Sequence, residues 1–246
     1  MAPRKHLGKP RDLPTLRARL DGLRLRGEVQ LRARSLLLVW LDAAIAQGVP
    51  FDEGLRALKS GAAARTIAAA ELQRIGANPP DALLRAACAP GCAFCCLLPG
   101  KDGGTILGAE AHALHPALVA LRGQPDGSAW HRDACPVLDP QSRMCRAYDA
   151  RPMLCRAYFS TDATACEANA NGQPVPGAAV LGSQGLMLSV QSVARAALAG
   201  VATLPSYALA RFARSTLDGA DLPEALRASR HAPRMLEDER KRLTGT

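Results

Sequence analysis

Long apolar runs are missing from this 246-residue chain. The opening residues, MAPRKHLGKPRDLPTL, are basic but lack the run of roughly 7 to 15 apolar residues that marks an export signal. No stretch approaches the ~20 uninterrupted apolar residues of a membrane helix, since Asn, Gln, Pro and Gly interrupt the uncharged residues 168–194. We therefore expect a cytoplasmic protein without a transmembrane segment, in a compartment where thiols stay reduced.

Aromatic residues are also scarce, at 4% of the chain, and none occurs in residues 1–34. That segment nevertheless holds ten Lys or Arg against three acidic residues, and so carries much of the net charge of +9. Without aromatic rings to stack on bases, its charge provides only non-specific attraction, and we do not expect specific nucleic-acid binding. A basic helix that docks an acidic protein partner stays open, beside the plainer interpretation that GC-rich codons supply the arginines.

Strand signals are weak throughout, because alternation of β-branched and aromatic residues is rare. Helical periodicity is clearer: Leu13, Leu16 and Leu20 recur at three- and four-residue spacing between arginines. Further helical patterns cover residues 35–48, 52–59, 62–75, 105–122, 206–218, 223–230 and 233–243, and the stretch leading to Arg195. We expect a mainly α fold, with helical N- and C-terminal lobes around a loop-rich, metal-binding cysteine region. The expected segments are a basic helical lobe at 1–78, a cysteine-cluster domain at 79–170 and a helical segment at 171–246.

Cysteine is the residue type that stands out. A chain long enough to form an ordinary apolar core does not need disulfides or a metal ion for stability, so eight cysteines indicate another use. All eight cysteines lie between residues 88 and 166, where Gly and Pro are frequent. The first thiol group, in the stretch CAPGCAFCC, has the spacing C-x3-C-x2-C-C and comprises Cys88, Cys92, Cys95 and Cys96. The second thiol group is more widely spaced and comprises Cys135, Cys145, Cys155 and Cys166.

Three interpretations compete for these thiols. Disulfides fit poorly, since a reducing compartment opposes them and the adjacent Cys95 and Cys96 bridge only with distortion. A redox pair, with Cys92 and Cys95 as C-x-x-C, lacks the βαβ pattern of thioredoxin-like folds and ranks second. A metal site fits best, because two or three intervening residues let one loop aim several sulfurs at a common centre. Thiolates are soft ligands that favour Zn, Cu(I) or iron–sulfur clusters, and we expect an iron–sulfur cluster or Zn.

The sequence Cys-Arg-Ala-Tyr occurs at residues 145–148 and again at residues 155–158. Pro152 lies between the copies, so they cannot share one face of a continuous helix. Such a repeat is typical of a loop that returns to one place and presents a second thiolate. Arginines in this stretch would donate to sulfurs or balance an anionic cluster, unless they are simply solvated. The expected supporting residues are Arg146, Arg151 and Arg156.

The order C-x3-C-x2-C-C, then CPVL at 135–138, then CRAYDARPMLCR at 145–156, resembles the YkgJ-type cysteine-cluster family of zinc- or iron-chelating domains. The resemblance covers about residues 85–166 and leaves the helical ends outside. It implies metal ligands among the first seven cysteines, with Arg151, Pro152 and Arg156 as an accompanying motif; Cys166 completes the expected set of eight. The family is similar to the flagellin lysine N-methylases, whose cysteine domain is associated with an iron–sulfur cluster. The resemblance therefore implies a metal site and names no substrate.

Other motifs indicate less. CAPGCAFC also fits the C-x3-C-x-aromatic-C loop of radical S-adenosylmethionine enzymes, but the β/α alternation that belongs with that loop is missing. GKDGGT at 100–105 is interpreted as a turn, and no Ser-His-Asp set or paired-carboxylate motif stands out. Three histidines are either surface residues or extra ligands: His112, His115 and His131. Four aspartates near the thiols are interpreted as turn residues: Asp133, Asp139, Asp149 and Asp162.

The expected function is a metal-binding protein that coordinates an iron–sulfur cluster or Zn through its cysteines. Whether it is an enzyme stays open. A methyltransferase-like or redox activity is one class, although the sequence shows no S-adenosylmethionine fingerprint. The other class is a zinc-stabilised interaction module whose basic N-terminal helix docks an acidic partner.

Overall fold

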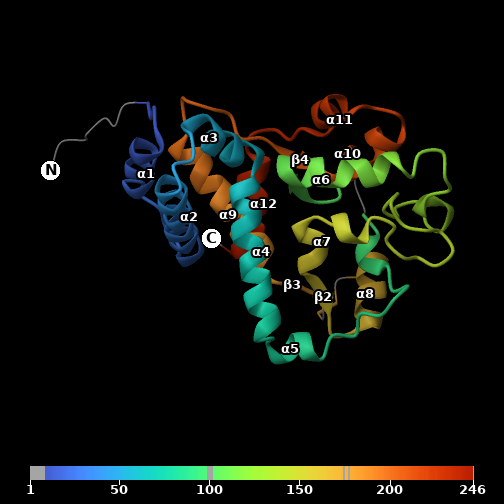
Figure 1. Cartoon of the computed structure of the whole chain (residues 1–246). Helices are drawn as coiled ribbons and strands as arrows, with labels where there is room; N and C mark the ends of the chain where they lie inside the picture. The colour runs from blue at the N-terminus through green and yellow to red at the C-terminus, as the bar shows by residue number, and fades with distance from the viewer. Residues whose placement is uncertain (1–8, 99–101, 174, 177, 246) are drawn as a thin grey trace.

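The computed structural model describes residues 9–98, 102–173, 175–176 and 178–245. These residues form a mainly α fold of twelve α-helices and four three-residue strands, as expected (Figure 1). The helices are α1 (Leu13–Asp21), α2 (Glu28–Ala46), α3 (Phe51–Ser60), α4 (Ala62–Ala77), α5 (Asp81–Leu84), α6 (Gly108–Val119), α7 (Met153–Ala157), α8 (Ala163–Ala170), α9 (Gly182–Ala197), α10 (Leu209–Leu217), α11 (Leu222–Ser229) and α12 (Met235–Thr244). The strands are β1 (Thr105–Leu107), β2 (Tyr158–Ser160), β3 (Ala178–Val180) and β4 (Ser206–Ala208). Within this part of the chain, no helix combines the length and apolar character needed to cross a membrane.

The largest apolar core forms around α9, whose side chains are buried on nearly every face. Helices α1, α2 and α4 from the N-terminal part pack on it, together with α12 from the C-terminal end (Figure 1). The leucine periodicity predicted α1 correctly, because Leu13, Leu16 and Leu20 all face this core. The two helical segments that flank the cysteine region in sequence therefore share one core.

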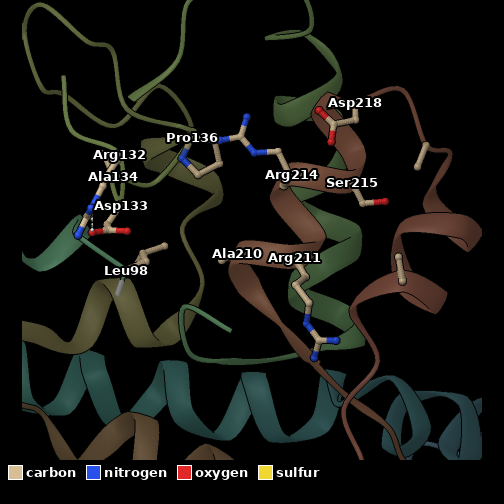
Figure 2. Close-up of a pocket in the computed structure, with 12 residues that line it drawn as sticks. Leu98, Arg132, Asp133, Ala134, Pro136, Ala210, Arg211, Arg214, Ser215 and Asp218 are labelled. Atoms are coloured by element: carbon tan, nitrogen blue, oxygen red, sulfur yellow. Dashed lines mark hydrogen bonds and ion pairs between the residues drawn. The ribbon is translucent and has the colours of Figure 1, made fainter. Parts of the chain in front are cut away.

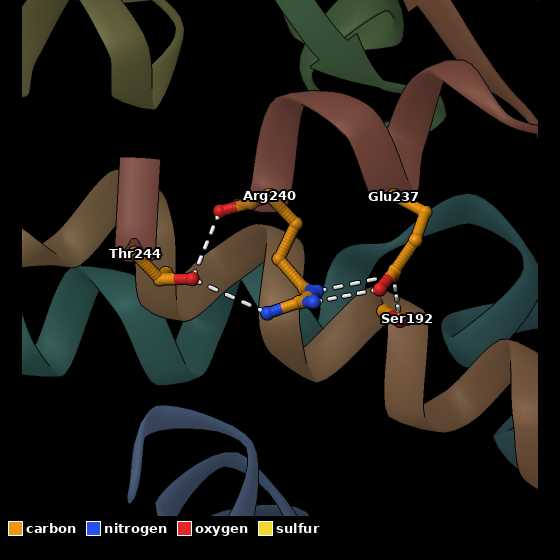
Figure 3. Close-up of polar contacts among 4 residues, drawn as sticks. All are labelled: Ser192, Glu237, Arg240 and Thr244. Atoms are coloured by element: carbon orange, nitrogen blue, oxygen red, sulfur yellow. Dashed lines mark hydrogen bonds and ion pairs between the residues drawn. The ribbon is translucent and has the colours of Figure 1, made fainter. Parts of the chain in front are cut away.

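An ion pair within α12 is linked to α9 by a hydrogen bond from Ser192 (Figure 3). The Arg240 side chain is 3% exposed and donates to both carboxylate oxygens of Glu237, at 2.6 and 3.0 Å. Ser192 of α9 donates to the same carboxylate at 2.9 Å, and Thr244 accepts from Arg240 at 3.2 Å. Because every charge in this network has a partner, the arginine is tolerated in the core.

A second core lies between the strand pair β1–β4 and the helices α6, α10 and α11. The strands are antiparallel, with Ile106 opposite Tyr207. Helical patterns were expected from residues 105 and 206, but in each case the first three residues form a strand before the helix begins. The reason is non-local, since each strand supplies the other's backbone partners from about a hundred residues away.

Helix α4 stands between the α9 core and the cysteine region (Figure 1). Gly61 separates α3 from α4 and has a φ of 81°, which an L side chain rarely adopts. A Cβ at this position would lie 2.7 Å from the Leu107 side chain. The close approach places α4 beside β1, and α4 also packs against α6 and α7. The cysteine region is thus attached to the helical core through α4 and through the packing of α7 on α9.

The cysteine region itself is loop-rich, as expected. Its elements are short: a 3-10 turn at Phe94–Cys96, then α7, β2 and α8. A small apolar cluster of Ala93, Leu97, Ala134 and Leu138 packs beneath the thiols. With so few regular elements, the positions of the sulfurs depend on individual hydrogen bonds between loops.

Candidate metal centre

Seven of the eight cysteines line one cavity of about 370 Å³. They are Cys88, Cys92, Cys95, Cys96, Cys145, Cys155 and Cys166. The early and late thiols therefore face a shared space, although up to 78 residues separate them. All eight cysteines fall within the described residues, and none forms a disulfide there.

Backbone pairing joins the first thiol group to Cys135. The Cys135 N–H donates to the Cys96 carbonyl at 2.7 Å, and the Leu98 N–H donates to the Asp133 carbonyl at 2.7 Å. Leu97 and Ala134 thereby form an isolated antiparallel bridge. Cys135 does not line the cavity, and this pairing places it directly behind Cys96.

A second set of contacts places β2, near the C-terminal end of the cysteine region, next to Cys88. The Ala87 N–H donates to the Ser160 carbonyl at 2.7 Å, and the Ser160 N–H donates to Cys88 Sγ at 3.4 Å. Strand β2 thus holds the beginning of the first thiol group. Helix α8 packs against the 3-10 turn at Phe94–Cys96, which brings Cys166 to the cavity.

Three sulfurs accept hydrogen bonds from the amide two residues further along the chain. The donors are the N–H groups of Phe94 to Cys92, Val137 to Cys135, and Ala147 to Cys145. Each bond lowers the pKa of its thiol, because it stabilises the negatively charged sulfur. Hydrogen bonds of this kind also tune metal–sulfur centres. The loops are therefore shaped to support thiolates.

Burial opposes that support in the metal-free chain. Desolvation raises the pKa of Cys135 to about 12 and also raises the pKa of Cys155, to which neighbouring thiolates add repulsion. Cys95 is the exception: its hydrogen bond with Cys96 lowers its pKa to about 7, and Arg151 assists. The same bond raises the pKa of Cys96, so the adjacent pair keeps one proton between them. A bound cation would remove this penalty by stabilising every thiolate around it.

The sulfurs surround the cavity without converging on one point. Among the described residues, no three His, Cys, Asp or Glu side chains lie close enough together to hold a single metal ion. Burial raises the pKa of Cys92, and the charges of Cys95, Cys166 and Cys88 add to the rise. The hydrogen bond and the charge of Cys95 also raise the pKa of Cys96, so Cys95 interacts with thiols on both sides of the cavity. The donor set is purely sulfur and suits a soft metal, but it is spread over more space than one ion needs.

The three expected supporting arginines occupy different places. Arg151 lines the thiol cavity, and its guanidinium stacks on the Tyr148 ring at 3.5 Å from the ring centroid. Arg146 donates to the Val137 carbonyl at 3.3 Å and lowers the pKa of Cys145. Arg156 lines a neighbouring cavity instead of the thiol cavity.

The histidines and aspartates lie away from the sulfurs. None of His112, His115 and His131 lines the thiol cavity; His115, for instance, packs on Phe212. Asp139 accepts from the Ser142 N–H at 2.7 Å, and Asp162 caps α8, so both serve as turn or cap residues.

Two tyrosines at the thiol cavity were not predicted from the sequence. Tyr148 and Tyr158 both line it, and burial raises the pKa of Tyr158 to about 12. The repeated Cys-Arg-Ala-Tyr contained the signal, because it places a tyrosine three residues after two of the cysteines.

A Ser-His-Asp arrangement also appears only in the fold. Ser206 Oγ lies 3.4 Å from His231 Nδ1, and His231 Nε2 lies 3.6 Å from Asp102 Oδ2. Ser206 is only 2% exposed, and burial lowers the pKa of His231. A buried hydroxyl in a strand pair cannot reach a substrate, so these residues tie β4 to the C-terminal segment.

Comparison with known proteins agrees with the cysteine geometry. Residues 87–172 match the model of the CxxCxxCC family, described as a "Putative zinc- or iron-chelating domain". No curated protein and no solved structure matches the chain. Residues 87–172 thus match a cysteine-cluster domain of the YkgJ type, and this match supports metal binding through the cysteines.

Proposed function

We propose that the thiol cavity holds an iron–sulfur cluster. The observation that carries this proposal is that seven thiols line one cavity of about 370 Å³, which is more thiols than a single tetrahedral ion uses. A tetrahedral zinc site needs four ligands around one point, each at about 2.3 Å for sulfur. A cluster contributes several iron atoms and its own sulfide, and so reaches thiolates on different walls.

All eight cysteines remain the proposed sulfur ligands and supporting sulfurs. The seven cysteines that line the cavity would bind iron. Cys135, which lies behind Cys96, would either bind iron or provide structural support to the other thiols. Iron–sulfur clusters held by thiolates are anionic, so charge balance matters. Arg151 is the proposed counter-charge: it helps to lower the pKa of Cys95 and opposes the rise that burial causes in the pKa of Cys145, where Arg146 assists.

When bound, such a cluster supplies one-electron transfer. The proposed role is therefore redox support in the cytoplasm, where eight free thiols stay reduced. Methyl transfer has less support, because the sequence shows no fingerprint for S-adenosylmethionine.

Docking of an acidic partner by the N-terminal helices also has little support, because several of their arginines already have internal partners. Arg17 forms an ion pair with Asp42, and Arg32 forms one with Glu71 at 2.7 Å. Arg19 donates to the Ala199 carbonyl at 2.8 Å. These arginines hold the helical core together.

The test is elemental analysis of anaerobically purified protein. We expect iron with matching acid-labile sulfide and absorbance at about 400 nm. Cys88→Ser, Cys95→Ser and Cys145→Ser should each reduce the iron content. Met144→Leu is the matched control, because Met144 lines the cavity and the change keeps its apolar bulk while removing a non-thiolate sulfur. If elemental analysis finds stoichiometric zinc and no sulfide, the site is a zinc centre and the cluster proposal is wrong. If the folded protein contains no metal, the proposal is also wrong.

A further inference from the structure

A second cavity, of about 410 Å³, lies between α4 and the segment around α7. Arg65, Thr66 and Gln73 line it from α4, and Arg151 and Arg156 line it from the other side. Alanines at positions 62, 69 and 70 leave the space between these longer side chains open. Because Arg151 lines both cavities, this one borders the thiol cavity.

The arginines here are not neutralised. Among the described residues, the side chains of Arg65 and Arg156 form no hydrogen bond or ion pair. The Arg151 side chain donates only from Nε, to the Tyr148 carbonyl at 3.1 Å. The one acid that lines the cavity is Glu110. Its two carboxylate oxygens already accept from the backbone N–H groups of Leu107, at 2.9 Å, and Met153, at 2.6 Å. Three guanidinium groups therefore face one carboxylate that is engaged elsewhere.

Another arginine-lined cavity of the protein lacks this property. It measures about 610 Å³, lies between α10 and the loop before Cys135, and also contains three arginines (Figure 2). Each of them has an acidic partner: Arg132 pairs with Asp133, Arg211 with Asp102 and Arg214 with Asp126. On α4 itself, Arg74 pairs with Glu71 at 2.9 Å. The 410 Å³ cavity thus differs from the 610 Å³ cavity, because its arginines have no acidic partner at ion-pair distance among the described residues.

We infer that this cavity binds the phosphate group of a small phosphate monoester. A guanidinium presents a planar set of N–H donors that matches phosphate oxygens, and three of them exceed the single negative charge of Glu110. Thr66 and Gln73 add neutral donors on the α4 side. The volume falls in the range of roughly 300 to 1,000 Å³ typical of small-molecule pockets. A phosphate ligand seated here would contact Arg151 at the border of the thiol cavity.

Titration calorimetry with inorganic phosphate at low ionic strength tests the inference. We expect saturable binding to the wild type, weakened about tenfold or more by Arg65→Gln and by Arg156→Gln, because each removes a charged donor. Arg156→Lys should weaken phosphate binding less than Arg156→Gln. Lysine keeps the positive charge and loses only the planar, two-pronged donor geometry of the guanidinium. Arg227→Gln is the control, an exposed arginine on α11 away from this cavity.

A second variant adds a negative charge to the cavity instead of removing a positive one. Thr66 is exposed on α4, so Thr66→Glu leaves the core intact while placing a negative charge in the cavity. It should abolish phosphate binding and the rise in melting temperature that phosphate produces in the wild type. Sulfate should compete and acetate should not. The inference would be overturned by a wild type without saturable phosphate binding, by wild-type affinity in both Arg65→Gln and Arg156→Gln, or by a preference for acetate.

Discussion

The backbone N–H of Cys135 donates to the carbonyl oxygen of Cys96 at 2.7 Å. This bond joins two loops that lie about 40 residues apart in the sequence. It aligns Leu97 with Ala134 as a short antiparallel bridge, and Leu138 then pairs with Cys145 in the same manner. Retention of metal should therefore depend on the small apolar cluster beneath these loops as well as on the sulfurs.

Leu138→Ala tests that dependence. Leu138 is 2% exposed in the cluster with Ala93, Leu97 and Ala134. Its truncation should lower the free energy of unfolding by about 2 to 5 kcal/mol and reduce metal content, because the cavity left behind loosens the Cys145 pairing. Urea denaturation and metal analysis measure the two effects. The control is Leu84→Ala, at a leucine that is 69% exposed, where neither quantity should change.

Glu110→Gln should loosen α7, the helix that contains Cys155. The Glu110 carboxylate accepts the N–H of Met153 in α7 and of Leu107 before α6. The side-chain amide of this variant would have only one acceptor oxygen, so its NH₂ would face either the Leu107 or the Met153 N–H. Leaving that N–H without an acceptor should cost about 1 to 3 kcal/mol of stability. Urea denaturation measures this cost against Glu167→Gln on the exposed face of α8. Equal stability of the two variants would show that the Glu110 bonds are dispensable.

Glu71 should stabilise the fold in a pH-dependent way. Its hydrogen bonds to Arg74 and Arg32 lower its pKa from 4.5 to about 2. Because the folded-state pKa is depressed, this contribution is complete above pH 4.5 and is lost as the pH falls toward about 2. The difference in stability between wild type and Glu71→Gln should be on the order of 2 kcal/mol at neutral pH and disappear near pH 2. Exposed Glu53→Gln should show no such pH dependence.

Arg240→Ala should destabilise the packing of α12. It removes a buried side chain and one partner of a Glu237 carboxylate that is 37% exposed, at an expected cost of about 1 to 3 kcal/mol. Arg242→Ala makes the same substitution two residues away, where the side chain is 66% exposed and pairs with Glu239. Its cost should stay below about 1 kcal/mol. Similar values for both variants in urea denaturation would contradict the role given to the buried network.

The thiols of the metal-free protein should differ in reactivity. The thiolate is the nucleophile, and Cys95 has a pKa of about 7, whereas burial raises the pKa of Cys135 to about 12. Iodoacetamide at neutral pH should therefore label Cys95 first and Cys135 late, as followed by peptide mass spectrometry. The Cys95 rate should rise as the pH passes through about 7. Metal loading should protect Cys95, and unprotected labelling of the loaded protein would exclude it as a ligand.

Local patterns accounted for much of the fold. Leucine spacing located α1, glycines and prolines marked helix ends, and the C-x3-C-x2-C-C spacing identified the domain now matched at residues 87–172. These signals succeed because helix formation and tight turns depend on residues within a few positions of each other. The strands β1 and β4 were missed for the opposite reason, since each strand pairs with the other across about a hundred residues of sequence.

The sequence by itself determined the chemistry of this protein: a sulfur-only donor set in a region of loops and short helices. Only the tertiary structure decided which groups meet. It placed Cys135 behind Cys96, Cys88 beside Ser160, and Arg65 of α4 at the same cavity as Arg156. Spacing along the chain constrains near neighbours alone, whereas these distant contacts depend on how the helical core packs α4 against the cysteine loops.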